Sequence, residues 1–274
     1  MQKSILTPAR IKAFRRTVYD YYEKYGRNLP WRATKDPYKI LVSEIMLQQT
    51  RVQRVIEKYN AFIKHFPTIR RLSQASLRDV MAQWQGLGYN RRALSLHRLA
   101  GSVMDHYQGR IPDDPKQLIV LPGIGRATAH AICTFAFNKP VVFVETNIRT
   151  VFIHHFFAHT SKVEDRAIIP FVHDTLDAQN PRQWYSALMD YGADLKKRFP
   201  NISQRSSAYI RQPPFHGSDR EIRGMVMRMA LQPEGCCEEV LVQTKGISPS
   251  RLRVVVERLL EENLVRRKKG SITI

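Results

Sequence analysis

Apolar residues recur at intervals of three and four along most of this chain, and this periodicity limits its fold more than any other feature. The stretch 8–25, for example, contains Ile11, Phe14, Val18, Tyr21 and Tyr22. Such spacing places the apolar side chains on one face of an amphipathic helix. Further helices are expected at about 37–49, 51–65, 76–83, 90–107, 115–120, 126–137, 145–158, 165–178 and 181–193. Because strand-like alternation is nearly absent here, the sequence predicts an all-α core.

A polar stretch divides the chain of 274 residues, which is longer than one average domain. Residues 198–217 contain three prolines and lack a helical stripe, so we interpret them as a linker. The core is then 1–197, and 218–274 form a small module.

Three short helices (219–231, 235–244, 248–263) and a hairpin (264–274) are expected in this module, an order that suits a winged helix. Ser248 is a candidate helix N-cap, followed by Pro249 at the first helical position.

The charge of the chain indicates a polyanionic partner. There are 44 Lys and Arg side chains against 24 Asp and Glu, and residues 1–214 carry +17 of the net +20. Nucleic acid is the commonest such partner, and a solubilising basic surface is the alternative. Because no signal-peptide-like start or 18-residue apolar segment is present, we expect a soluble protein of the cytoplasm, associated with the nucleoid or otherwise intracellular, with no membrane partner.

A glycine-containing turn is expected between two helices in the segment LPGIGRATA, 121–129. Gly123 and Gly125 allow the backbone to approach a phosphate, while Arg126 adds charge and Thr128 a hydroxyl at the helix start. Carbonyl oxygens of this hairpin are also candidate ligands of a monovalent cation. An ordinary tight turn is the alternative.

Six motifs occur in one order: LPWR (29–32), SEIMLQQT (43–50), GLGYNRRA (86–93), LPGIGRATA (121–129), VETNIR (144–149) and LMDYGA (188–193). Together they resemble the motif set of MutY-type adenine DNA glycosylases of the helix-hairpin-helix superfamily, over roughly residues 8–195. The resemblance implies a two-lobed helix-hairpin-helix glycosylase fold with the active site in the cleft between the lobes. It also implies base excision repair, in which an adenine mispaired with guanine or 8-oxoguanine is flipped out of the duplex and its N-glycosidic bond is hydrolysed.

Cleaving this bond builds negative charge on the base and positive charge on the sugar, so the site needs an acid and a carboxylate. By resemblance, Glu44 is the acid that protonates adenine at N7, and apolar neighbours are expected to raise its pKa by desolvation. Glu145, where family members usually have aspartate, is expected to stabilise the sugar cation, and Asn147 to position the water or that carboxylate. Capping of a helix is the alternative for Glu145.

The resemblance also assigns residues to the DNA and to the base. After flipping, the family fills the gap in the stack from QQT and GLGY, and the matching residues are Gln49, Thr50, Leu87 and Tyr89. Tyr89 is expected to wedge into the duplex and Leu87 with Thr50 to contact the orphan base, although core packing is an equal alternative for Tyr89 and Leu87. Arg32 is expected to line the base pocket, and Arg91 and Arg92 to contact phosphates.

Three departures from the family pattern change the expected chemistry. Ala127 stands where strand-cleaving relatives place a Schiff-base lysine, so we expect a monofunctional enzyme that uses water. Many relatives carry four cysteines for a [4Fe-4S] cluster after LMD-x-GA, but this chain has none between Cys133 and Cys236, so neither a cluster nor another metal is expected. The nudix-like C-terminal domain of typical MutY-type proteins is replaced by about sixty residues.

Basic side chains are expected to contact phosphate where the cluster is missing, namely Lys196, Lys197, Arg198 and Arg205. The run Arg266, Arg267, Lys268 and Lys269 suits a wing tip on DNA, or a solvated surface strand.

The expected partner is therefore double-stranded DNA with a mispaired or damaged base, bound by a monomer. Alternatives from the same superfamily are glycosylases for mismatched thymine or uracil, or for a deaminated purine. An alternative of another class is a non-catalytic DNA-binding protein.

Overall fold

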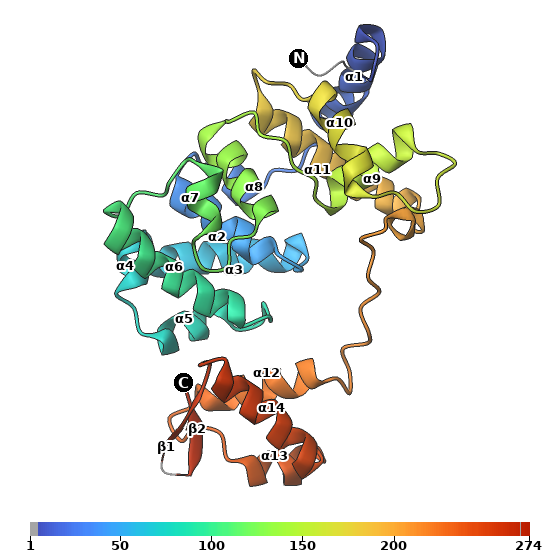
Figure 1. The fold of residues 1–274 in the computed structure, drawn as a ribbon. Coiled ribbons are helices and arrows are strands. Elements are labelled where there is room, and N and C mark those ends of the chain that lie inside the picture. Colours follow the sequence, from blue (N-terminus) through green and yellow to red (C-terminus); the bar gives the residue numbers. More distant parts are fainter. Residues whose placement is uncertain (1–4, 269) are drawn as a thin grey trace. The chain divides into compact units, whose positions relative to one another are not determined.

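The computed structural model describes residues 5–268 and 270–274, and almost all regular structure in it is helical (Figure 1). The elements are α1 (Pro8–Tyr25), η1 (Pro30–Arg32), α2 (Pro37–Leu47), α3 (Val52–His65), α4 (Ile69–Ser73), α5 (Leu77–Trp84), α6 (Arg91–Tyr107), α7 (Pro115–Ile119), α8 (Arg126–Phe137), α9 (Thr146–Phe156), α10 (Asp165–Thr175), α11 (Pro181–Arg198), η2 (Ile202–Arg205), α12 (Asp219–Ala230), α13 (Glu238–Lys245), α14 (Pro249–Glu261), β1 (Arg266–Lys268) and β2 (Ser271–Thr273). The all-α class is confirmed.

Two compact units make up the chain, and each is described by itself. The first comprises residues up to Glu44, Pro112–Val120 and Ile124–Arg211. The second comprises Ile45–Ile111, Leu121–Gly123 and Gln212–Ile274. No described helix is long and apolar enough to cross a membrane.

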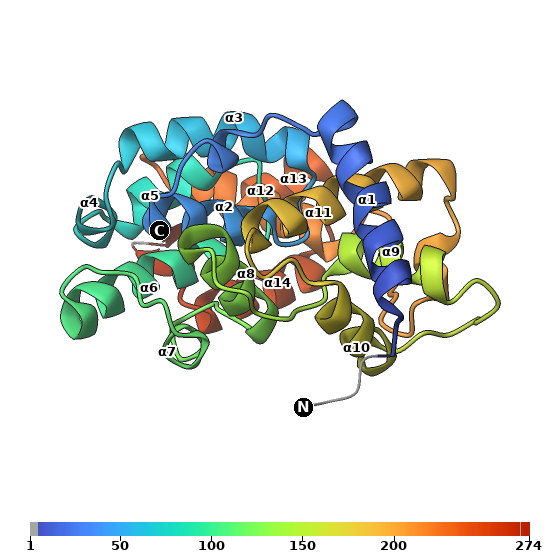
Figure 2. The ribbon, with the colours of Figure 1, turned by 90° about the horizontal axis from the view of Figure 1, so that it is seen from above.

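The core of the first unit forms where α11 packs along α9, with α1 against α11 and α10 (Figures 1 and 2). Phe14 of α1 meets Phe152 of α9 and Trp184 of α11, with ring centroids 5.4 and 5.9 Å apart. All three side chains are buried. Burial of such large aromatic side chains, at about 25 cal/mol per Å² of apolar surface, holds these three helices together.

Helix α11 continues to Arg198, past the end expected near residue 193. Leu195 continues the apolar stripe and is fully buried. The basic residues in the last turn interact favourably with the negative, C-terminal end of the helix dipole. The stretch interpreted as a linker also begins with structure, because η2 follows and buries Ile202.

Helices α3, α4, α5 and α6 of the second unit surround Phe62 and Trp84, whose rings meet edge to face at 5.9 Å. Helix α4 was not expected, because five residues are too short to show a helical period. The Thr68 side chain caps it by accepting from the Arg71 N–H.

The C-terminal residues of this unit form α12, α13 and α14, followed by the antiparallel pair β1 and β2 (Figure 1). Ser248 and Pro249 occupy the expected N-cap and first positions of α14. The Ser248 side chain makes no capping hydrogen bond, however, and its Oγ contacts Ser250 Oγ at 2.8 Å instead.

The expected basic wing tip is only partly available for DNA. Arg267 is paired with Glu238 at 2.7 Å and Glu257 at 3.0 Å, so its charge is already used inside the module and is not available for the DNA contact expected of a wing tip. Arg266 and Lys268 are exposed, and Lys269 lies outside the described residues.

Candidate active site

Glu44 lies on α2 in the first unit, where Tyr38, Ile40, Leu41 and Val42 are buried beside it. The Asp36 carboxylate accepts from the Tyr38 N–H at 2.9 Å and holds the start of the helix. Glu44 itself is partly buried. Burial and the negative charge of Glu145 raise its pKa to about 8, although the charge of Arg32 opposes the shift. A carboxyl group with this pKa is mostly protonated at neutral pH, so it can act as an acid.

Glu145 is the N-cap of α9. Its Oε1 accepts from the backbone N–H groups of Asn147 at 2.7 Å and Ile148 at 2.9 Å. The Asn147 side chain donates through Nδ2 to Oε2 at 3.4 Å. Glu145 therefore caps the helix, as the alternative interpretation proposed. The two backbone N–H groups bind only its Oε1, so its Oε2 is contacted by the Asn147 side chain and not by the backbone. The negative charge of Glu145 is one of the two causes that raise the Glu44 pKa, after burial.

Helix α11 approaches the start of α9 at a glycine. A Cβ atom added to Gly192 would lie 2.2 Å from the carbonyl oxygen of Asn147, so only glycine fits there. One turn later, Lys196 Nζ donates to Asn147 Oδ1 at 2.8 Å. Burial lowers the pKa of Lys196, while the charge of Glu145 opposes that shift. Lys196 was expected to contact phosphate, but its ammonium group instead binds the Asn147 side chain, where the charge of Glu145 acts on it.

Arg32, expected to line the base pocket, is held by Asp190 of α11. Its Nη1 and Nη2 donate to Asp190 Oδ2 and Oδ1 at 2.7 and 2.8 Å, and the Arg27 side chain and backbone bind the same carboxylate at 2.7 Å. Burial alone would raise the Asp190 pKa, but hydrogen bonds from Arg32 and Arg27 and the charge of Arg32 outweigh it and lower the pKa. Asp190 therefore stays ionised although its side chain is 1% exposed.

Asp190 and Arg27 were not among the expected site residues. Asp190 is the acid of LMDYGA, and an acidic residue inside an apolar helical stripe requires a cationic partner. That signal was present in the sequence, but it does not identify the partner.

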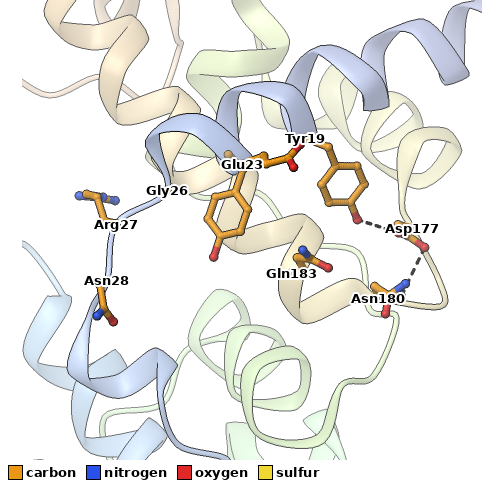
Figure 3. Close-up of a pocket in the computed structure, with 9 residues that line it drawn as sticks. Tyr19, Glu23, Gly26, Arg27, Asn28, Asp177, Asn180 and Gln183 are labelled. Atoms are coloured by element: carbon orange, nitrogen blue, oxygen red, sulfur yellow. Dashed lines mark hydrogen bonds between the residues drawn. The ribbon is translucent and has the colours of Figure 1, made fainter.

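A pocket beside this network lies in the first unit (Figure 3), with a volume of about 730 Å³. It is lined by Tyr19, Tyr22, Glu23, Gly26, Arg27, Asn28, Asp177, Asn180 and Gln183. The Tyr19 hydroxyl donates to Asp177 at 2.6 Å on its wall. Neither Glu44 nor Glu145 lines it, so it does not coincide with the two carboxyl groups.

The hairpin glycines differ in what they require. Gly123 has φ +79°, and a Cβ there would lie 2.7 Å from Ser95 Cβ, so both conformation and space require glycine. Gly125 has an extended backbone and is the N-cap of α8, without a side-chain cap. Arg126 is exposed in the first turn and Thr128 is partly buried.

Arg92 is bound within the second unit, so its interpretation as a phosphate contact is corrected. Its guanidinium donates to Thr50 Oγ1 and to the carbonyl oxygens of Ile45, Met46, Gln48, Leu87 and Gly88. Burial lowers its pKa to about 10. Because the last carbonyls of a helix lack partners, a buried guanidinium at this place stabilises both the end of α2 and the turn 86–90.

Arg91 forms an ion pair with Glu262 at 2.7 Å, and Glu262 also binds Arg223. Arg205, another expected phosphate contact, donates to the carbonyl oxygens of Phe157 and Thr160. Arg198 pairs with Asp194 at 2.9 Å, whereas Lys197 is exposed.

The residues expected to fill the gap in the duplex divide into two groups. Leu87 is 2% exposed and packs in the core, which favours the alternative for this residue. Thr50 is partly buried and accepts from Arg92. Tyr89 is 39% exposed and has φ +50°, and the exposed Gln49 has φ +54°. Gln212 donates to the Tyr89 hydroxyl at 3.1 Å.

Comparison with known proteins agrees with this arrangement. Residues 42–168 match the model of the HhH-GPD superfamily of base excision DNA repair proteins. An adenine DNA glycosylase of Buchnera aphidicola is 37% identical over 185 residues, which are 66% of this chain and 52% of the relative. The Mycobacterium tuberculosis adenine DNA glycosylase is 41% identical over 132 residues, covering 48% and 43%. The chain thus spans about half the length of the curated relatives it matches.

A solved structure of a thermostable thymine-DNA glycosylase superposes with a TM-score of 0.60 at 27% identity. The superposition covers 68% of this chain and 87% of that one. Sequence, motif order and fold therefore lead to one conclusion: residues 42–168 belong to the HhH-GPD superfamily of base excision DNA repair proteins, and the chain is similar to the MutY-type adenine DNA glycosylases.

Proposed function

We propose that this chain is a DNA glycosylase of base excision repair that hydrolyses the N-glycosidic bond of an adenine opposite guanine or 8-oxoguanine. The observation that carries the proposal is the geometry of Glu145, whose Oε1 caps α9 while Asn147 Nδ2 contacts its Oε2. Burial, together with the charge of Glu145, raises the pKa of the second carboxyl group, that of Glu44. Paired carboxyl groups with different protonation states supply the acid and the anion that glycosidic cleavage needs. The adenine DNA glycosylases among the relatives support adenine as the target.

In the proposed reaction, the protonated Glu44 carboxyl donates its proton to the departing base and thereby neutralises the charge developing on it. Positioned proton donors of this kind accelerate reactions by about 10²- to 10⁴-fold. The Glu145 carboxylate stabilises the positive charge on the sugar through Oε2, the oxygen that the two backbone N–H groups leave free. Water then attacks the sugar carbon and loses a proton, which returns to the Glu44 carboxylate and restores the acid, while Asn147 orients Glu145 or the water.

Ala127 cannot form a Schiff base, so we propose a monofunctional enzyme without strand-cleaving activity. We also propose that no [4Fe-4S] cluster is required, because the segment that follows LMDYGA contains no cysteine before Cys236.

DNA binding is proposed to involve the exposed Gly123, Gly125 and Arg126 of the hairpin, with Thr128 at the helix start. Exposed Tyr89, with Gln49, is the candidate to enter the gap left by the flipped base. We propose that the protein acts as a monomer inside the cell and that 218–274 form a winged-helix-like module.

The proposal is tested with a panel of labelled duplexes that carry A:G, A:8-oxoG, T:G, U:G or hypoxanthine, under single-turnover conditions. We expect release of adenine, and strand breaks only after hot alkali. Glu44→Gln should lose base release and retain duplex affinity, while the exposed Glu57→Gln, also on a helix, should match the wild type.

Each other outcome of this panel has one meaning. Release of thymine, uracil or hypoxanthine instead of adenine would show that the enzyme acts on one of the alternative substrates. These duplexes are included because the fold is similar to that of a thymine-DNA glycosylase. Strand breaks without alkali would contradict the monofunctional assignment. DNA binding with no base release from any duplex would show a non-catalytic DNA-binding protein.

A further inference from the structure

Lys196 is connected to Glu145 through a single side chain. Its Nζ donates to Asn147 Oδ1 at 2.8 Å, and Asn147 Nδ2 donates to Glu145 Oε2 at 3.4 Å. The three groups come from two helices, since Lys196 lies in the last turn of α11 and the others lie at the start of α9.

The contact with Lys196 determines which end of the Asn147 amide faces the carboxylate. A carboxamide has one acceptor oxygen and one donor nitrogen, and an ammonium group is a donor only. With Lys196 on Oδ1, the donor end of Asn147 is directed to Glu145. The reversed amide would place its oxygen against a carboxylate and its N–H groups against an ammonium, so both contacts would become repulsive.

The charge of Lys196 also acts on Glu145. The titratable groups that interact with this pair are Glu44 on α2, Arg149 on α9 itself and Arg32 of η1, which acts on Glu44. Glu44 is the acid, whose protonated form carries no charge, and Arg149 is already bound to Asp165 at 2.6 and 2.7 Å. Among these groups, the Lys196 ammonium is the cation without a carboxylate of its own in direct contact.

Helix packing holds Lys196 in this place. Gly192 permits the close approach of α11 to the Asn147 backbone, one turn before Lys196. Leu195 is fully buried, and Lys197 is exposed. Two neighbouring lysines therefore have different surroundings on one helix.

We propose that Lys196 is a positioning residue for base excision: it orients the Asn147 amide so that Nδ2 faces the Glu145 carboxylate. This inference rests on the proposed glycosylase function. It replaces the interpretation of Lys196 as a contact for DNA phosphate.

The experiment compares Lys196→Met, Lys196→Arg, Lys197→Met and the control Lys24→Met in the full chain. Lys24 is an exposed lysine in the last turn of α1. Single-turnover release of adenine from an A:G duplex is measured between pH 5 and 9, together with duplex affinity and thermal unfolding. For Lys196→Met we expect a rate about 10- to 100-fold lower, with duplex affinity within about threefold of the wild type. The pH profile of its rate should also change, because burial lowers the pKa of the Lys196 ammonium and the variant lacks this titrating group. Lys196→Arg should regain part of the rate, and Lys24→Met should keep all of it.

A double-mutant cycle separates positioning from a general loss of structure. If Lys196 acts through Asn147, Lys196→Met should lower the rate much less in an Asn147→Ala background than in the wild type. Independent, multiplicative effects of the two substitutions would contradict the inference.

Three further results would overturn it. The first is an unchanged rate and pH profile in Lys196→Met. The second is an equal loss of duplex affinity in Lys196→Met and Lys197→Met, as expected of phosphate contacts. The third is a covalent DNA complex trapped by borohydride with the wild type but not with Lys196→Met, which would make Lys196 a nucleophile. A wild type that releases no base from any duplex would instead refute the glycosylase function itself.

Discussion

Arg32 and Asp190 form a two-pronged ion pair, with Nη1–Oδ2 and Nη2–Oδ1 separations of 2.7 and 2.8 Å, although 158 residues separate them in the sequence. The Asp190 side chain is 1% exposed and that of Arg32 is 16% exposed. The pair joins η1, which precedes the helix of Glu44, to α11, which carries Gly192 and Lys196. The Arg32–Asp190 ion pair therefore connects the segment before Glu44 with the helix that contacts Asn147.

Asp190→Asn should lower the free energy of unfolding at pH 7 by about 3–5 kcal/mol, because it leaves a buried guanidinium without its carboxylate. The folded pKa of Asp190 is depressed, so its contribution is present above the unfolded pKa and is lost as pH falls through the folded one. The stability difference between wild type and variant should therefore shrink toward low pH.

Urea unfolding at pH 7 and at pH 3 measures this difference. Asp20→Asn provides the control, since Asp20 pairs with Arg16 on the exposed surface of α1 and should contribute little. Equal stability of Asp190→Asn and wild type at pH 7 would contradict the assigned role.

Glu44 should make the folded protein less stable as pH rises. Its folded pKa of about 8 lies above the ordinary glutamate pKa of 4.5, so the folded chain retains a proton that the unfolded chain releases between these values. Glu44→Gln has no carboxyl group to ionise and avoids this penalty. At pH 8 its free energy of unfolding should be higher than that of the wild type by on the order of 1–3 kcal/mol.

Chemical unfolding at pH 5 and pH 8 tests the effect, and the gain should be smaller at pH 5. The exposed Glu57→Gln should change stability equally at both values. The same titration predicts that base release by the wild type declines as pH passes about 8, because the acid must be protonated.

Gly192→Ala should destabilise the protein and reduce base release together. The added Cβ would lie 2.2 Å from the Asn147 carbonyl oxygen, so α11 and the start of α9 must separate, and overpacking of this kind costs about 1–3 kcal/mol or more. A shift of the Asn147 backbone would also displace the Glu145 carboxylate, because that carboxylate accepts from the Asn147 N–H.

Gly224→Ala is the matched control for this variant. Gly224 also lies inside a helix, but nothing is within 4 Å of its added Cβ, so alanine should be neutral or stabilise α12 by about 0.5–1 kcal/mol. Thermal unfolding and single-turnover rates of both variants distinguish close packing from a general effect of alanine.

Arg92→Lys should reduce stability by about 2–4 kcal/mol, because one ammonium group cannot reach the carbonyl oxygens that the guanidinium binds at the end of α2 and in the turn 86–90. Arg91→Lys should have little effect, since Arg91 is 70% exposed.

Guanidinium chloride unfolding measures both variants, and the salt dependence of duplex affinity provides the opposing test. Removing the charge of a phosphate contact would lower the salt slope by about one without changing stability. That pattern for Arg92→Met would restore the interpretation of Arg92 as a DNA contact.

Local sequence was sufficient to predict the helices and several site residues. Apolar periodicity predicted α1, α3 and α6 to within a few residues, because burial of one face requires it. Gly123 was identified from its turn, and its conformation and surroundings do require glycine. The order of the motifs predicted the superfamily that residues 42–168 match.

Only the tertiary structure decided which polar groups use their hydrogen bonds inside the protein. A surface arginine and the partly buried Arg92 have the same local sequence signal, and their difference depends on the carbonyl oxygens of residues 45, 46 and 48, more than forty positions earlier in the chain. The partners of Asp190 and Lys196 were likewise fixed by the packing of α11 against η1 and α9. Periodicity specifies which face of a helix is buried, whereas charge pairing depends on which helices meet, and that is settled by side-chain packing between distant segments.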